Sequence, residues 1–152
     1  MLRDLTTDDL PALLQHARTI HAAGVYAAYP MDENRVAYIL QAVIEAPNAF
    51  TKAYEIGGEV AGFFLGEVIQ DLWIDVQVAV DHLFYVRPES RSSRAGVMLI
   101  RAFEEWAAES GADVIRPVVY AGLDNAAVSG VLTRMGYETS GTVHKKEVAG
   151  CA

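Results

Sequence analysis

The fold of this chain is decided by the stretch Val86-Arg87-Pro88-Glu89-Ser90-Arg91-Ser92-Ser93-Arg94-Ala95-Gly96. It joins an apolar, strand-like segment, 81–86, to a segment with apolar residues at helical spacing. That spacing is i, i+3, i+4, i+7 and is set by Leu99, Ala102, Phe103 and Trp106. It predicts an amphipathic helix that begins at about Arg94. The free amide groups at the start of such a helix point back toward the end of the strand, where an anion such as a diphosphate can bind.

Two arginines inside this loop strengthen the prediction of an anion site. Arg91 and Arg94 lie among small residues, and no acidic residue follows Glu89 before the helix. Guanidinium groups form charge-assisted hydrogen bonds with phosphate oxygens. The alternative is an ordinary strand-to-helix turn whose basic side chains are solvated.

This loop resembles the acyl-coenzyme A loop of the GCN5-related N-acetyltransferases (GNAT). The pattern of that loop is Arg or Gln, two residues, Gly, one residue, then Gly or Ala. Arg91 and Gly96 match it, whereas Arg94 stands where the family usually has its first glycine. Arg94 is compatible with the loop if its φ is negative and its side chain points outward.

A second segment, 125–137, resembles the other GNAT signature, in which an Asn opens a helix that closes on a Gly followed by an aromatic residue. Here these residues are Asn125, Gly136 and Tyr137. Many members place a Tyr seven residues after the Asn as general acid, and this chain has Leu132 there. The two segments occur in the family's order, so together they are far more specific than either alone. The resemblance extends over nearly the whole chain.

The resemblance implies an α/β (α+β) fold of the GNAT type. Its mixed, mostly antiparallel sheet has six or seven strands, flanked by about four helices, and two central parallel strands splay apart. Besides the helices named above, the residue patterns predict helices over 6–23 and 32–46, and strands over 2–4, 50–56, 59–69, 73–86, 113–120 and 137–148. We expect Gly57-Gly58 to form the turn of a hairpin, and the long strand 73–86 can contain a bulge. Pro117 should interrupt strand pairing, either where the central strands splay apart or on an edge strand.

Composition limits the class of protein. The chain has 152 residues, with 52% hydrophobic and 21% charged residues, which is typical of one globular domain. We expect a single acetyltransferase domain over 1–148 and a tail over 149–152. The net charge of −8 disfavours nucleic acid and favours amines or basic protein segments as partners.

No apolar run is long enough to cross a bilayer, and no signal peptide pattern precedes the domain. A cytoplasmic protein that does not bind membranes is therefore expected. The one cysteine, Cys151, lies near the C-terminus, where we expect a surface thiol. The four histidines do not have the spacing of a metal site, so we expect no metal.

Acetyl transfer to an amine needs a group that accepts the amine's proton and one that returns a proton to the thiolate. On strand 73–86, strict alternation places His82 among valines and Phe84 on one face, and Asp81 on the other. His82 is the first candidate for general base and Asp81 the second; the alternative for His82 is a hydrogen-bonded core histidine. Tyr120 is the candidate general acid, and Ser129 or water is the alternative. A tyrosine at a strand end usually serves packing.

The resemblance also implies which residues bind acetyl-CoA. Backbone groups of Tyr85 and Val86 would contact the pantetheine amides, and Asn125 the pantetheine arm. The residues expected at the phosphates are Arg91, Ser92, Ser93, Arg94, Ala95 and Gly96.

The predicted function is N-acetyltransferase, with transfer from acetyl-CoA to a primary amine of a small molecule or protein by direct attack in a ternary complex. The alternative is a catalytically weak or inactive acyl-CoA-binding regulatory module, which the departures at Arg94 and Leu132 favour. The connection 24–31 is apolar for a loop and either covers the core or shapes the acceptor pocket. The resemblance also points to a homodimer.

Overall fold

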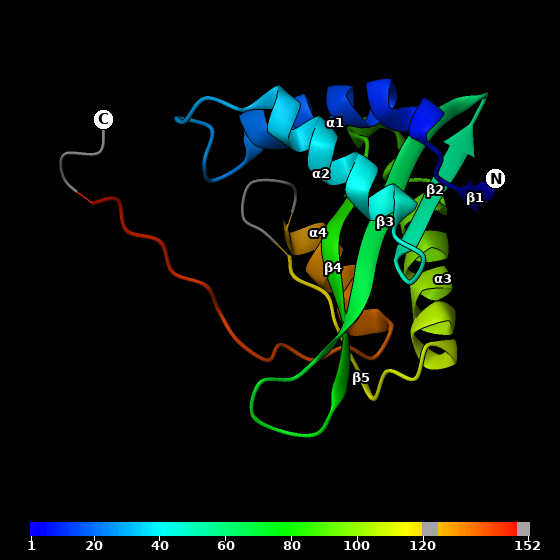
Figure 1. Ribbon diagram of the computed structural model, residues 1–152, viewed down its shortest axis with the longest axis vertical. Coiled ribbons are helices and arrows are strands. Elements are labelled where there is room, and N and C mark those ends of the chain that lie inside the picture. The colour runs from blue at the N-terminus through cyan, green and yellow to red at the C-terminus, as the bar shows by residue number, and fades with distance from the viewer. Residues whose placement is uncertain (120–124, 149–152) are drawn as a thin grey trace.

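The computed structural model describes residues 1–119 and 125–148. The elements follow one another as β1 (Leu2–Asp4), the short 3-10 helix η1 (Thr7–Asp9), α1 (Leu10–Ala23), α2 (Glu33–Glu45), β2 (Phe50–Ile56), β3 (Glu59–Gln70), β4 (Gln77–Val86), the 3-10 helix η2 (Pro88–Ser90), α3 (Ala95–Glu109), β5 (Val114–Arg116) and α4 (Asn125–Arg134). Figure 1 shows α1 and α2 on one side of the sheet and α3 on the other.

The five strands form one sheet in the order β1-β2-β3-β4-β5. All neighbours are antiparallel except β4 and β5, which are parallel because α3 carries the chain back along the sheet. The hairpin between β2 and β3 turns at Gly57 and Gly58, whose φ values of 63° and 83° favour glycine. The predicted α+β fold with a mixed sheet and four helices is therefore confirmed.

Each face of the sheet buries its own apolar cluster. Toward α3 and α4, Phe64 stacks on Phe103 with ring centroids 4.2 Å apart, and Leu132 is buried in the same cluster. Toward α1 and α2, Phe63 and Leu65 pack against helix residues such as Leu13 and Leu40. Adjacent residues of β3 thus belong to opposite clusters, as strand alternation requires.

A bulge in β4 reverses this alternation. Leu65 pairs with Leu83 while the next residue of β3, Gly66, pairs with Asp81, so His82 is an extra residue in β4. Before the bulge Ala79 packs toward α3, and after it Phe84 and Val86 do so. Our prediction that the even-numbered residues from Val76 to Val86 share one face was wrong, because the extra residue shifts the parity at His82.

Other boundaries also differ from the expected ones. The described residues form five strands rather than six or seven, because 137–148 contains no strand. The fourth strand begins at Gln77 rather than at residue 73, and β5 ends at Arg116, immediately before Pro117. The predicted interruption at Pro117 is confirmed.

No helix within residues 1–119 and 125–148 is both long and apolar enough to cross a membrane.

Gly66 permits the close approach of α3 at the bulge. A Cβ at this position would lie 2.6 Å from Cε2 of Phe103 and 2.8 Å from the backbone oxygen of Val80. Because that oxygen belongs to the neighbouring strand, Gly66→Ala should lower the free energy of unfolding by about 1–3 kcal/mol. Urea denaturation followed by circular dichroism measures this change.

Gly141→Ala is the matched control, because a Cβ at Gly141 meets no heavy atom within 4 Å. Equal stability of the two variants would contradict the tight packing inferred at the bulge.

Candidate functional site

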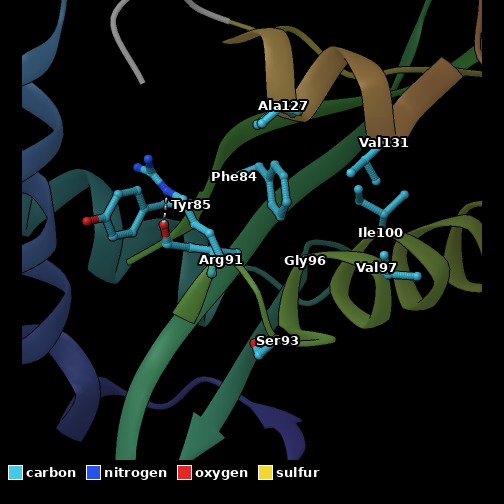
Figure 2. A pocket seen from close by; sticks show the side chains of 11 residues that line it. Phe84, Tyr85, Arg91, Ser93, Gly96, Val97, Ile100, Ala127 and Val131 are labelled. Carbon is cyan, nitrogen blue, oxygen red and sulfur yellow. Dashed lines mark hydrogen bonds between the residues drawn. The ribbon is translucent and has the colours of Figure 1, made fainter. Parts of the chain in front are cut away.

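A cavity of about 130 Å³ lies where the end of β4, the start of α3 and helix α4 meet. Its lining includes the predicted residues Tyr85, Val86, Arg91, Ser93 and Gly96. Figure 2 shows Phe84 extending toward α4, whereas the Tyr85 side chain points the other way. Tyr85 lies beside His16 on the α1 side, and its burial raises the pKa of its hydroxyl. Tyr85 therefore offers this cavity its backbone rather than its hydroxyl.

The loop before α3 is held by its own side chains. Ser93 Oγ donates to the carbonyl of Ser90 at 2.6 Å and accepts from the Ala95 amide at 3.2 Å. Arg91 Nε donates to the carbonyl of Val86 at 3.2 Å, the dashed line in Figure 2. Arg87 is also engaged, with Glu59 at 2.8 Å. These contacts fix the course of the loop between β4 and α3.

Arg94 adopts an ordinary conformation at the helix start. Its φ is −76° and its ψ is 0°, so the glycine of the family pattern is not required by the backbone here. The first intrahelical bond of α3 runs from the Met98 amide to the Arg94 carbonyl at 2.9 Å. The amides of Gly96 and Val97 lie in the first turn and have no partner within the helix, which is the arrangement that binds anions.

Only some of the predicted coenzyme residues line the cavity. Arg91, Ser93 and Gly96 line the cavity with the two β4 residues, whereas Ser92 and Arg94 are exposed in the loop and Ala95 is fully buried. Asn125 is the first residue of α4. Tyr120, the candidate general acid, lies outside the described residues.

Sequence reasoning missed the apolar half of the cavity. The additional lining residues are Phe84, Val97, Ile100, Ala127, Val128 and Val131. Val128 and Val131 belong to the apolar stripe of α4, which indicates burial but does not say whether a residue packs or borders a cavity. Leu132, one residue further, is buried at 8% exposure in the core cluster.

A second cavity of about 390 Å³ adjoins the first. Phe84 and Val128 line both cavities, so these two side chains form their common boundary. The rest of its lining comes from the end of α1, the following connection, the β4 bulge and the segment after β5, namely Ile20, His21, Gly24, Val25, Tyr26, Asp81, His82, Leu83, Val118 and Val119. The connection 24–31 therefore helps to shape a pocket, which was one of the two alternatives.

Asp81 and His82, at the bulge, both line this cavity, as do Leu83 and Phe84, which belong to the core clusters on opposite faces of the sheet. Asp81 pairs with Gly66, whereas His82 contacts Glu67, the next residue of β3. The His82 side chain is 38% exposed, with Nε2 3.3 Å from Oε1 of Glu67, so it is not a core histidine. Asp81 Oδ1 accepts from the amide of Val118 at 2.7 Å.

Asp81 stands where the two parallel strands separate. Pairing of β4 with β5 ends at Val80 and Arg116, and Pro117 supplies no amide hydrogen to continue it. The Asp81 carboxylate instead holds the next residue, Val118. Burial raises the pKa of the Asp81 carboxyl, and the hydrogen bond from the Val118 amide opposes that rise.

Among the residues that the structure describes, no group of three or more His, Cys, Asp or Glu side chains could hold a metal ion.

Comparisons with known proteins agree with this geometry. The family model for the acetyltransferase (GNAT) family matches residues 9–137, so the chain belongs to the GNAT family of acetyltransferases. No curated protein matches the chain significantly.

Several solved structures share the fold at low sequence identity. A transcriptional regulator from Bacillus halodurans C-125 is 15% identical, with a TM-score of 0.77 over 97% of this chain and 99% of that one. An aminoglycoside acetyltransferase from an uncultured soil metagenomic sample, in complex with sisomicin, is 16% identical, with a TM-score of 0.70 over 97% and 95%. A Pyrococcus furiosus protein provisionally described as an acetyl transferase is 22% identical, with a TM-score of 0.74 over 97% and 99%.

Asp81→Asn separates the hydrogen bond of Asp81 from its charge, since an amide oxygen can still accept from Val118. Folding raises the pKa of the Asp81 carboxyl, so the native state binds the proton more tightly than the unfolded state does. Ionisation of this carboxyl therefore lowers the stability of the fold as the pH rises above the pKa of the unfolded carboxyl, about 3.9. The variant should therefore melt at or above the wild-type temperature at pH 7, and the difference should shrink toward pH 4. Thermal unfolding at both pH values tests this. A large loss of stability at pH 7 would contradict it.

Proposed function

We propose that residues 1–148 form one N-acetyltransferase domain that transfers an acetyl group from acetyl-CoA to a primary amine. The observation that carries this proposal is the pair of adjoining cavities. One borders the start of α3 and Arg91, and the other borders Asp81 and His82. A thioester in the first and an amine in the second would meet at Phe84 and Val128.

The first cavity suits the coenzyme for two reasons. Its basic rim and the free amides of the first turn of α3 can bind the diphosphate, with Arg91, Ser93 and Gly96 nearest. Arg94 and Ser92, exposed beside them, are proposed to reach the outer phosphates. Its apolar walls can hold the pantetheine arm against β4, where Tyr85 and Val86 offer backbone groups, and Asn125 is proposed to contact the same arm.

In the proposed reaction the neutral amine nitrogen attacks the thioester carbonyl carbon, the carbon–sulfur bond breaks, and the products are an amide and coenzyme A. His82 accepts the amine proton directly or through water. If Nε2 holds its hydrogen toward Glu67, Nδ1 is the acceptor and Glu67 stabilises the imidazolium that forms. Asp81 attracts the ammonium form of the acceptor to the site.

Leu132 cannot supply the proton that the leaving thiolate needs, and it is buried in the core. Tyr120 or water is proposed for this role. Three of the similar structures carry the name aminoglycoside acetyltransferase, which makes aminoglycosides one candidate class of acceptor alongside other amines and lysine-bearing proteins.

The activity test is acetyl-CoA-dependent thiol release in the presence of a panel of primary amines. His82→Gln should lower kcat/KM by about 100-fold or more, because it removes the proton acceptor. His144→Gln is the matched control, since His144 lies exposed in the C-terminal segment beside Thr142.

Equal rates for the two histidine variants would contradict the role of His82. Coenzyme binding with no amine-dependent turnover would favour the regulatory module instead.

A further inference from the structure

Phe84 and Val128 form the boundary between the two cavities. Among residues 1–119 and 125–148, no other residue lines both. Figure 2 shows Phe84 extending from β4 toward α4, the helix to which Val128 belongs. In the proposed reaction the thioester and the amine meet at this boundary. Phe84 and Val128 are therefore the residues that face the acyl group during its transfer.

The Phe84 ring is held in place by its neighbours. Phe84 pairs with Phe64 of the adjacent strand β3, and the centroids of the two rings are 5.2 Å apart. Phe64 is 1% exposed and stacks on Phe103, so the core behind Phe84 is filled. On the side of α3, a Cβ at Gly96 would lie 3.7 Å from Cζ of Phe84. The ring therefore cannot move into the core without displacing packed side chains.

Val128 makes the other side of the boundary stiff. It lies in the first turn of α4 and packs against the core cluster that contains Phe103 and Leu132. A valine in a helix has one strongly preferred χ1 rotamer, because its Cβ carries two methyl groups. A fixed aromatic ring thus faces a fixed branched side chain. Widening this boundary for a larger group would need shifts of packed atoms, which cost free energy.

The boundary has different consequences for short and long acyl groups. An acetyl group adds a single methyl beyond the thioester carbonyl. A longer acyl group has to extend either past Phe84 and Val128 into the second cavity or back into the first cavity, whose volume is only about 130 Å³. A chain that enters the second cavity also occupies space that the amine needs. Both routes disfavour the longer donor.

We propose that Phe84 and Val128 restrict the transferred acyl group to acetyl, by blocking longer acyl chains at the boundary between the cavities. This inference rests on the proposed acetyltransferase function and adds the residues that select its acyl donor. Both side chains are hydrocarbon, so they act through the space that they leave and not through proton transfer. Specificity of this kind comes from a clash with the wrong ligand and not from an added contact to the right one.

Calorimetric titration with acetyl-CoA and butyryl-CoA tests the proposal, because the two donors differ only in the length of the acyl chain. Wild-type protein should bind acetyl-CoA about tenfold or more tightly than butyryl-CoA. Val128→Ala removes two methyl groups from the boundary and should reduce this preference about fivefold or more, through tighter binding of butyryl-CoA. Phe84→Leu should act in the same direction. General damage to the protein would not produce a gain in affinity.

Val131→Ala and Val119→Ala are the matched controls. Each makes the same truncation as Val128→Ala, but Val131 lines only the first cavity and Val119 only the second. Each control should leave the ratio of the two affinities within about twofold of the wild-type ratio, because it changes the binding of both donors alike. Melting temperatures of all variants establish that each is folded.

Two failures are distinguishable. This inference is overturned, and the acetyltransferase function left standing, if wild-type protein binds both donors equally well or if Val128→Ala leaves the preference unchanged. The same holds if Val131→Ala relaxes the preference as much as Val128→Ala does, because the long chain would then lie in the first cavity. Absence of binding of coenzyme A and of both donors by the folded wild-type protein overturns the inference and the proposed function together.

Discussion

A single extra residue in β4, His82, sets the direction of every β4 side chain on either side of it. Before the bulge, Ala79 packs toward α3; after it, Phe84 and Val86 do. Both sections of the strand therefore contribute to one core although their parity differs. At the bulge itself, Asp81 and His82 both line the second cavity. Gly66 makes this arrangement compatible with close packing, because no side chain stands between the bulge and Phe103.

The separation of β4 and β5 depends on the same region. Pro117 ends the ladder, and the Asp81 carboxylate replaces the missing backbone pairing by holding the amide of Val118 at 2.7 Å. Beyond this point β5 has ended, and two cavities lie beside β4 with Phe84 and Val128 between them. One residue thus serves both the geometry of the cleft and its negative charge. The cost is a partly buried carboxyl whose pKa is raised by desolvation.

Much of this arrangement was predictable from the sequence. Helical spacing and turn residues predicted α1 to α4 within a few residues, and Gly57-Gly58 and Pro117 marked the hairpin and the end of β5. The loop from Arg91 to Gly96 was predicted because its small residues precede a helix. The position of the bulge was not predictable, because β4 has valines on both faces. The residue pattern therefore does not show where the even-numbered residues change from one face to the other. The absence of strand in 137–148 was missed too, because pairing depends on partners that a local pattern does not specify. The contact of Lys145 with residues 120 positions away has no local signal.

The most direct test of the account is calorimetric titration of the purified protein with acetyl-CoA. We expect saturable binding of one molecule per chain in the micromolar range. We also expect Gly96→Leu to abolish this binding while the protein stays folded. The Cβ at Gly96 would lie 3.7 Å from Cζ of Phe84, an ordinary contact, and the rest of the leucine side chain would fill a cavity of about 130 Å³. Absence of binding by the wild-type protein, or equal binding by the folded variant, would contradict the assignment of this cavity to the coenzyme.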